Sequence, residues 1–307
     1  MEYLLLLLGI ACAAFGGELF IRGAVGIAYA ARIKPAIIGV TIAAFATSSP
    51  ELSIAINAGA SQHSSIALGD TLGSNIVNVS FILAVALLIS PISVSKSTTQ
   101  RDFTLALFVP IVSAVLLLDN ELSRFDGAIL LTLFIGWLIA AIVEAKKDRK
   151  KTLHQENVQT LRKYVLPTLI GLVMLFAAGN FIVTSATTIA KSFGVNDFLI
   201  GATIVALGTS VPELASTIMA KIRGHNDMSL GTILGSNIFN GLLIVATAAL
   251  LNPITITFQE VLPTIAFGIA VLLFSYPYRN NTITRLQGGL LLMLYFAYLG
   301  VMIWTQT

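Results

Sequence analysis

Two short segments of the chain place a carboxylate directly after a proline inside a long apolar stretch. The segment "FATSSPE" ends at Glu51, and the segment "LGTSVPE" ends at Glu213. An ionisable side chain within an apolar segment is costly and is typically functional. Because carboxylate oxygens are the ligands that hard cations prefer, these two residues are candidates for an ion-binding site.

The proline in each segment predicts a break in the helix that carries the carboxylate. Pro50 lacks a backbone N–H and disfavours helical geometry at Ser49, so we expect the helix to break there. Ser48 or Ser49 could then cap a second half-helix, with Glu51 in its first turn. We expect the carbonyls freed near Ala46, Thr47 and Ser48 to face the same space, where a cation could coordinate them.

The composition is that of a membrane protein with several spans. Of the 307 residues, 56% are hydrophobic and 11% are charged, and the mean hydropathy is +0.89. Apolar runs near the length of a membrane span recur along the chain, which predicts an all-α polytopic membrane protein. The first run continues to Ala31 without a small-residue cleavage site, so we expect a first span rather than a cleaved signal peptide.

Ten transmembrane helices are predicted from the apolar runs. Their ranges are Tyr3–Ala31, Pro35–Ala60, Ile66–Ser90, Phe103–Leu118, Phe125–Val143, Val165–Ala190, Phe198–Ile222, Leu230–Leu251, Val261–Phe274 and Leu286–Trp304.

The two halves of the chain are repeats of each other. The stretch "IIGVTIAAFATSSPELSIAI" from Ile37 aligns with "LIGATIVALGTSVPELASTI" from Leu199, and "LGDTLGSNIVN" from Leu68 aligns with "LGTILGSNIFN" from Leu230, at a constant offset of 162 residues. Each repeat contains five predicted spans, and an odd number gives the second copy the opposite sense in the membrane. We therefore expect two inverted five-helix repeats, residues 1–143 and 164–307, joined by a basic linker at 144–163.

The basic residues fall in alternate loops and so predict the orientation in the cell membrane. They are Arg32, Lys34, Lys96, Arg101, the cluster from Lys146 to Lys163, Lys221, Arg223, Arg279 and Arg285. By the positive-inside rule these loops and the central linker are cytoplasmic, and both termini lie outside. The net charge of +3 therefore reflects topology, and no nucleic-acid partner is indicated.

Inversion of the second repeat should bring the two helix breaks together, so that Glu51 and Glu213 face each other. Two carboxylates in a low-dielectric site repel unless they are protonated or bridged by positive charge, and a divalent cation would balance both. Oxygen ligands alone suit calcium better than zinc or copper. The next span of each half adds a serine and an asparagine four residues apart on one helical face, after a glycine, Gly73 or Gly235, that permits close helix approach. These pairs are Ser74 with Asn78 and Ser236 with Asn240.

The paired motifs resemble the two α-repeats of the cation/calcium antiporter superfamily, in particular its sodium/calcium exchanger branch of prokaryotic type. The resemblance is carried by "TSSPE" with "GSNIVN" and by "GTSVPE" with "GSNIFN", and the layout of ten spans extends it to nearly the whole chain. It implies alternating-access exchange of sodium for calcium, with no cofactor. The calcium ligands that the resemblance implies are Thr47, Glu51, Thr209 and Glu213.

The resemblance also implies sodium sites that flank the calcium site and share its ligands. The sodium set is Ala44, Thr47, Ser48, Glu51, Ser74, Asn78, Ala206, Thr209, Ser210, Glu213, Ser236 and Asn240. The expected partners are the lipid bilayer and these two ions, and no obligatory protein partner is indicated.

Two departures from the family pattern keep a second coupling ion open. Ala46 stands where the first motif usually has glycine, and Asn78 and Asn240 stand where some prokaryotic relatives carry an aspartate. The centre is thus expected to hold two acids rather than three. The alternative is a proton/calcium antiporter, although that branch typically has asparagine and alanine before the first glutamate.

Two other classes of protein fit the sequence less well. A passive cation channel would also use acids and freed carbonyls at the middle of the membrane, but the inverted duplication favours a carrier. An enzyme is not indicated, because no histidine or cysteine lies near the paired glutamates in the sequence and no metal-protease spacing occurs.

Overall fold

The computed structural model describes residues 2–31, 33, 35–60, 64–95, 98–151, 158–192, 206–278 and 280–304. In the first half of the chain the elements are α1 (Glu2–Ala31), α2 (Pro35–Ile38), η1 (Gly39–Ala43), α3 (Ala44–Thr47), α4 (Ser49–Ala60), α5 (Ser64–Ile76), η2 (Val77–Leu83), α6 (Ala84–Ile89), β1 (Ile92–Ser93), η3 (Thr99–Phe103), α8 (Thr104–Leu116), β2 (Glu121–Leu122) and α9 (Arg124–Lys151). In the second half they are α10 (Val158–Ser192), α12 (Ala206–Thr209), α13 (Val211–Ile222), α14 (Asn226–Ile238), η5 (Phe239–Ile244), α15 (Val245–Leu251), β3 (Ile254–Thr255), α16 (Phe258–Ser275), β4 (Thr282–Ile283) and α17 (Arg285–Trp304).

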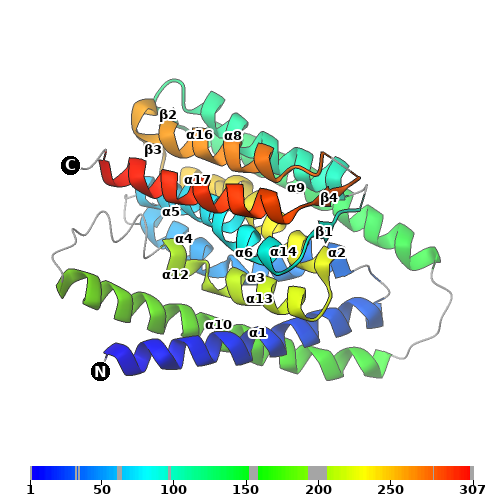
Figure 1. The fold of residues 1–307 in the computed structure, drawn as a ribbon. Helices are drawn as coiled ribbons and strands as arrows, with labels where there is room; N and C mark the ends of the chain where they lie inside the picture. Colours follow the sequence, from blue (N-terminus) through cyan, green and yellow to red (C-terminus); the bar gives the residue numbers. More distant parts are fainter. Residues whose placement is uncertain are drawn as a thin grey trace.

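The long helices run side by side as an elongated bundle (Figure 1). Helices α1 and α10 pack against each other along one face, and α16 and α17 lie on the opposite side. The helices that carry the candidate ligands lie between these two layers. Helix α1 begins and α17 ends at the same end of the bundle, whereas α9 ends and α10 begins at the other end (Figure 1).

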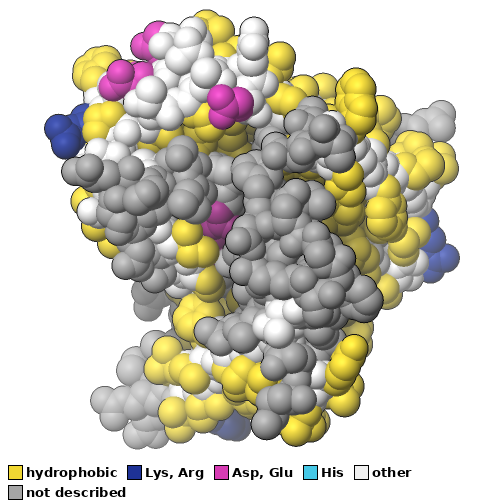
Figure 2. Space-filling view, turned by 90° about the vertical axis from the view of Figure 1, so that its left-hand side faces the viewer, with side chains coloured by type: hydrophobic (Ala, Val, Ile, Leu, Met, Phe, Trp, Pro, Cys, Tyr) yellow, Lys and Arg dark blue, Asp and Glu magenta, His cyan; other side chains and the backbone are white. Residues whose placement is uncertain are grey.

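The described helices have the length and composition of membrane spans. Six of them are long and apolar enough to cross a membrane, or seven if one bent pair is counted as a single span. Large hydrophobic side chains are exposed on their outer faces, such as Leu7 at 65%, Val173 at 66% and Phe296 at 60%. Much of the described surface is correspondingly hydrophobic, while exposed acidic side chains gather near β2 and β3 (Figure 2). These features confirm the prediction of an all-α polytopic membrane protein.

The predicted number of ten spans stays a prediction. The range Phe103–Leu118 contains the 13-residue helix α8, which directly follows the five-residue π-helix η3. The first part of Phe198–Ile222 lies outside the described residues. A count of spans from the described helices alone is therefore smaller than the number of apolar runs in the sequence.

The helix that carries Glu51 is interrupted at Ser48, as predicted. Helix α3 ends and α4 begins on either side of this residue, and the segments Gly39–Thr47 and Ser49–Ile56 are bent by 53°. The second motif has the same local structure, because α12 and α13 are separated at Ser210. The chemical cause is the proline in the following turn, which cannot donate to the preceding helix.

The predicted capping of the half-helices is wrong. The Ser49 hydroxyl donates to the carbonyl four residues before it at 2.9 Å, and Ser48 turns its hydroxyl toward Glu213. Ser210 makes no side-chain capping hydrogen bond within the described chain. The Ser48 carbonyl, which we predicted to be free, accepts the N–H of Leu52 at 3.1 Å. Because each break is one residue long, helical hydrogen bonding resumes at once and the serine hydroxyls remain available for tertiary contacts.

Each repeat changes from an α-helix to a π-helix immediately after its "GSNI" sequence. Helix α5 is followed by η2, and α14 is followed by η5. Asn78 and Asn240 are the second residues of these π-helices. The change from α-helix to π-helix therefore falls between each asparagine and the serine four residues before it. Short π-helical turns are frequent at functional sites because they rotate side chains out of the regular α-helical pattern.

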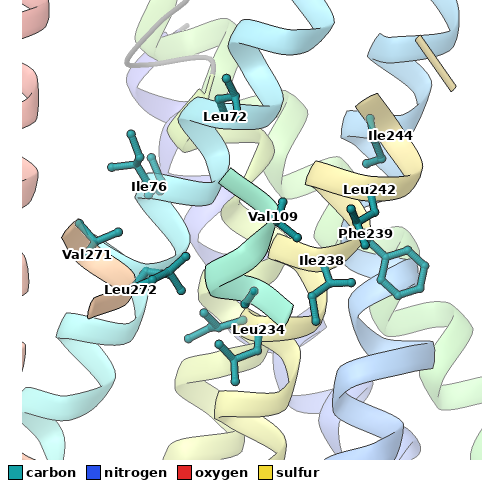
Figure 3. Close-up of a cluster of buried hydrophobic side chains, with 14 of the residues drawn as sticks. Leu72, Ile76, Val109, Leu234, Ile238, Phe239, Leu242, Ile244, Val271 and Leu272 are labelled. Carbon is teal, nitrogen blue, oxygen red and sulfur yellow. The ribbon is translucent and has the colours of Figure 1, made fainter. Parts of the chain in front are cut away.

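The two halves share one hydrophobic core and two short strand pairs. Strand β1 pairs with β4, and β2 pairs with β3, so each pair takes one strand from each half. The core combines buried side chains of α5 and α8 with those of α14, η5 and α16 (Figure 3). The labelled members are Leu72, Ile76, Val109, Leu234, Ile238, Phe239, Leu242, Ile244, Val271 and Leu272. Neither half therefore buries its apolar surface by itself.

Gly235 and Gly73 occupy matching positions but differ in how closely a neighbour approaches. A Cβ added at Gly235 would lie 2.5 Å from the Val40 carbonyl oxygen and 2.6 Å from the Ala44 Cβ, whereas at Gly73 the nearest atom, on Ala206, would be 3.7 Å away. The predicted close helix approach is thus confirmed at Gly235, while Gly73 has room for a methyl group.

We expect Gly235→Ala to destabilise the purified protein by about 1 to 3 kcal/mol, because the added methyl group forces α14 away from η1 and α3. Gly73→Ala is the matched control and should unfold at nearly the wild-type temperature. The measurement is thermal unfolding in detergent, followed by circular dichroism. Equal unfolding temperatures for the two variants would contradict the assigned difference in packing.

Candidate ion-binding site

Glu51 and Glu213 occupy the same place in their two helices. Each lies in the first turn after a break, Glu51 in α4 and Glu213 in α13, and each is only 1% exposed. The N-terminal end of a helix carries partial positive charge, which favours a carboxylate there. That effect is modest beside the cost of burying a full charge, so both groups need further partners.

Glu213 receives hydrogen bonds from both halves of the protein. The Ser48 hydroxyl donates to Glu213 Oε1 at 3.0 Å, and the Ser236 hydroxyl donates to the same oxygen at 3.2 Å. Its second oxygen, Oε2, is buried and has no hydrogen-bond partner among the described residues. The contact from Ser48 joins the first motif directly to the second.

Glu51 lacks the corresponding hydrogen bonds. Both of its carboxylate oxygens are buried and without a hydrogen-bond partner in the described part of the chain. The hydroxyls of Ser74 and Ser210, which match Ser236 and Ser48 in the repeat, are buried and unpartnered within the same described set. The two halves therefore differ, and the oxygen atoms still able to bind a ligand are concentrated on the Glu51 side.

Each of the two motif threonines lies near the glutamate of the opposite half. Thr47 lies near the Glu213 carboxylate, and Thr209 lies near that of Glu51. Their hydroxyls donate to carbonyls of their own helices, from Thr47 to Ala43 at 3.1 Å and from Thr209 to the Ala206 carbonyl at 3.1 Å. Each threonine thus places its side chain near the carboxylate of the other half.

The carbonyls of the two candidate alanines already take part in helical hydrogen bonds. The Ala44 oxygen accepts the Ser48 N–H at 2.9 Å, and the Ala206 oxygen accepts the Ser210 N–H at 3.3 Å. A carbonyl oxygen has two lone pairs, so one helical hydrogen bond does not prevent it from contacting a cation.

The asparagines form a buried amide network that the sequence analysis described only in part. Asn78 Nδ2 donates to Asn237 Oδ1 at 3.1 Å, whereas both polar side-chain atoms of Asn240 have no hydrogen-bond partner within the described residues. Asn75 and Asn237 each donate their amide to the other's backbone carbonyl, at 3.2 Å in both directions. The signal for this pair is the asparagine of the repeated "GSN" sequence, which the predicted site did not include.

The predicted ligand set is gathered in the interior of the protein. Eleven of its members are buried and Thr209 is half-buried. The buried ones are Ala44, Thr47, Ser48, Glu51, Ser74, Asn78, Ala206, Ser210, Glu213, Ser236 and Asn240. Within the described residues no group of three or more His, Cys, Asp or Glu side chains is placed to hold a metal ion. Two carboxylates surrounded by neutral oxygens suit a hard cation such as calcium or sodium, and they do not suit zinc or copper.

A third acid, Asp70, was missed by the sequence analysis. It lies on α5, and both its carboxylate oxygens are buried without a hydrogen-bond partner among the residues described. The signal was its position four residues before Ser74, which places it on the helix face that carries the other ligands.

The fold and site together define a membrane transporter of small cations, and comparison with known proteins identifies the family. The family described as sodium/calcium exchanger protein matches residues 1–143 and 163–304. The chain belongs to this family, whose members are transporters and not enzymes.

Two curated relatives extend over nearly the whole chain. The sequence is 33% identical over 304 residues to the "Putative antiporter CaxA" of Alkalimonas amylolytica, covering 95% of both chains. It is 27% identical over 344 residues to the "Sodium/calcium exchanger MaX1" of Methanosarcina acetivorans, covering 98% of both.

The fold matches a solved exchanger. The structure of the sodium-calcium exchanger NCX_Mj soaked with 10 mM Na⁺ aligns with a TM-score of 0.85 and 28% sequence identity. The alignment covers 97% of this chain and 98% of that one. The similarity therefore includes the whole bundle as well as the two motifs.

Proposed function

We propose that this protein exchanges sodium for calcium across the membrane by alternating access. The observation that carries the proposal is the pair Glu51 and Glu213, one from each half, both buried. Three of their four carboxylate oxygens have no hydrogen-bond partner within the described residues. Family membership and the exchangers that it resembles support the same activity.

The charge of the site favours a divalent ion. Two ionised carboxylates in a poorly solvated interior repel each other, and one calcium ion neutralises both. The proposed calcium ligands are the two carboxylates together with the peptide carbonyls of Thr47 and Thr209. The side chain of each threonine lies near the carboxylate of the opposite half.

Sodium carries half the charge and is bound well by neutral oxygens, so several sodium ions could replace one calcium ion. The unpartnered hydroxyls of Ser74 and Ser210 and the amide oxygen of Asn78 are suitable ligands. The full proposed sodium set is Ala44, Thr47, Ser48, Glu51, Ser74, Asn78, Ala206, Thr209, Ser210, Glu213, Ser236 and Asn240.

Alternating access follows from the proposed inverted repeats, residues 1–143 and 164–307 with a linker at 144–163, each of five spans. Support comes from the identical breaks at Ser48 and Ser210 and from the matching π-helices η2 and η5. When two inverted halves surround one site, an exchange of their conformations opens the site to the opposite side of the membrane.

We further propose a cell-membrane orientation with both termini outside and the linker cytoplasmic. The first and last helices begin and end at one end of the bundle, and the segments next to the linker lie at the other (Figure 1). The basic residues near the linker and the exposed acids Asp119, Glu121 and Glu260 are consistent with this orientation.

Removal of either central carboxylate is expected to abolish calcium transport. Glu51→Gln or Glu213→Gln leaves the divalent ion half neutralised in a buried site, which should weaken calcium binding by about 3 to 5 kcal/mol. Calcium uptake into proteoliposomes gives the measurement, and Glu260→Gln at an exposed glutamate is the control. Wild-type uptake by either buried-site variant would refute the assignment of these ligands.

The orientation can be tested by cysteine labelling in a Cys12→Ser background. A cysteine at Lys150, in the basic linker, should be protected from an impermeant thiol reagent in intact cells. A cysteine appended after Thr307 should react. The opposite pattern would invert the proposed topology.

The coupling ion is tested by imposing gradients of sodium, potassium and protons separately on proteoliposomes. We expect calcium uptake to require internal sodium and to fall several-fold in Ser74→Ala and Ser236→Ala, because sodium depends on neutral oxygen ligands. Uptake driven by a pH gradient without sodium, and unaffected by the serine variants, would establish proton coupling instead. Uptake without any counter-ion would identify a channel.

A further inference from the structure

Asp70 gives the two halves different charges. Its counterpart in the second repeat, at the same offset of 162 residues, is Thr232, whose hydroxyl donates to the Met228 carbonyl of its own helix at 3.0 Å. The first half thus carries a carboxylate where the second half carries a neutral side chain that is already hydrogen-bonded. None of the proposed ligand sets uses Asp70.

The Asp70 carboxylate is buried although the residue as a whole is half-buried. Both carboxylate oxygens are shielded from solvent, and neither has a hydrogen-bond partner among the described residues. A structural aspartate normally accepts hydrogen bonds from a helix terminus or an arginine, since an unpartnered buried carboxylate is destabilising. This arrangement points to a ligand that binds from outside the chain.

Asp70 is less buried than the central pair, since the residue is half-buried whereas Glu51 and Glu213 are each 1% exposed. It is one helical turn before Ser74 on α5, and it is close enough to Glu51 for their charges to interact. The Thr209 side chain lies beside both carboxylates. The unpartnered oxygens of Ser74 and Glu51 therefore lie between Asp70 and the centre of the site.

Asp70 does not join Glu51 and Glu213 in a single cluster of three ligands within the described residues. One cation therefore cannot bind all three carboxylates at once in this conformation. Asp70 instead lies outside the central pair, nearer than Ser74 to the N-terminal end of α5.

We propose that Asp70 is an outer binding group for a divalent cation, which it captures and passes to Glu51 past Thr209 and Ser74. The inference rests on the proposed calcium transport. It adds to the central site a second binding position that only one half of the protein provides. A negative group at the access route raises the local cation concentration and the rate of association. Because Thr232 is neutral, only one of the two inverted halves provides this group.

The test is calcium binding by the purified protein in detergent, measured by equilibrium dialysis and by the rate of association after rapid mixing. We expect Asp70→Asn to slow calcium association by about tenfold, while equilibrium dialysis should still detect binding at the central site. Asp70→Glu, which keeps the charge, should restore most of the rate. At saturating calcium, transport by Asp70→Asn in proteoliposomes should stay within about twofold of wild type, because the central carboxylates remain.

Two controls separate the proposed role from general effects. Thr232→Val removes the hydroxyl at the matching position, and Glu121→Gln removes one exposed negative charge near β2. Both should bind calcium as the wild type does.

The possible outcomes distinguish this inference from the proposed function. Wild-type binding kinetics in Asp70→Asn would overturn the role of Asp70 as an outer binding group and leave the proposed central site unaffected. Loss of transport by Asp70→Asn even at saturating calcium would also overturn it, by making Asp70 a central ligand. If the wild type binds no calcium, both proposals fail. If protons drive uptake but Asp70→Asn still slows calcium association, the outer binding role of Asp70 is supported and the proposed coupling to sodium is refuted.

Discussion

The site depends on one electrostatic constraint, the burial of two like charges contributed by different halves of the chain. Glu51 and Glu213 are both almost completely enclosed, yet they retain three oxygens without a hydrogen-bond partner within the described residues. Such an arrangement is destabilising unless positive charge is supplied, and it selects a small hard cation. The surrounding hydroxyls, amides and peptide groups supply additional oxygen ligands.

The helix breaks and π-helices are the local features that place side chains around these two carboxylates. A continuous α-helix would keep its peptide groups hydrogen-bonded and would direct the motif side chains along one regular stripe. The break at Ser48 bends the helix by 53° and turns one serine toward the opposite half, where it meets Glu213 at 3.0 Å. At η2 and η5 the helix changes from α-helical to π-helical geometry next to the two asparagines.

The duplicated sequence does not produce a symmetric site. Glu213 receives two serine hydrogen bonds, whereas the corresponding serines around Glu51 make none among the described residues. The difference between the halves agrees with the proposed alternating access, in which each conformation favours one half. Asp70 adds a difference in sequence to this difference in conformation.

The sequence by itself determined the class of the protein, the helix break before each of the two motif prolines and the burial of the two glutamates. These features follow from local chemistry, namely apolar run length, the missing proline N–H and the cost of a buried charge. Only the tertiary structure decided which serine bonds which glutamate, why Ser48 and Ser210 do not cap their helices, and that Asn75 and Asn237 pair across the interface. Those contacts join residues about 160 positions apart, so their geometry depends on how the whole bundle packs. The role suggested for Asp70 emerged in the same way, because its closeness to Glu51 arises from packing of α5 against α4 and its closeness to Thr209 arises from packing between the two halves.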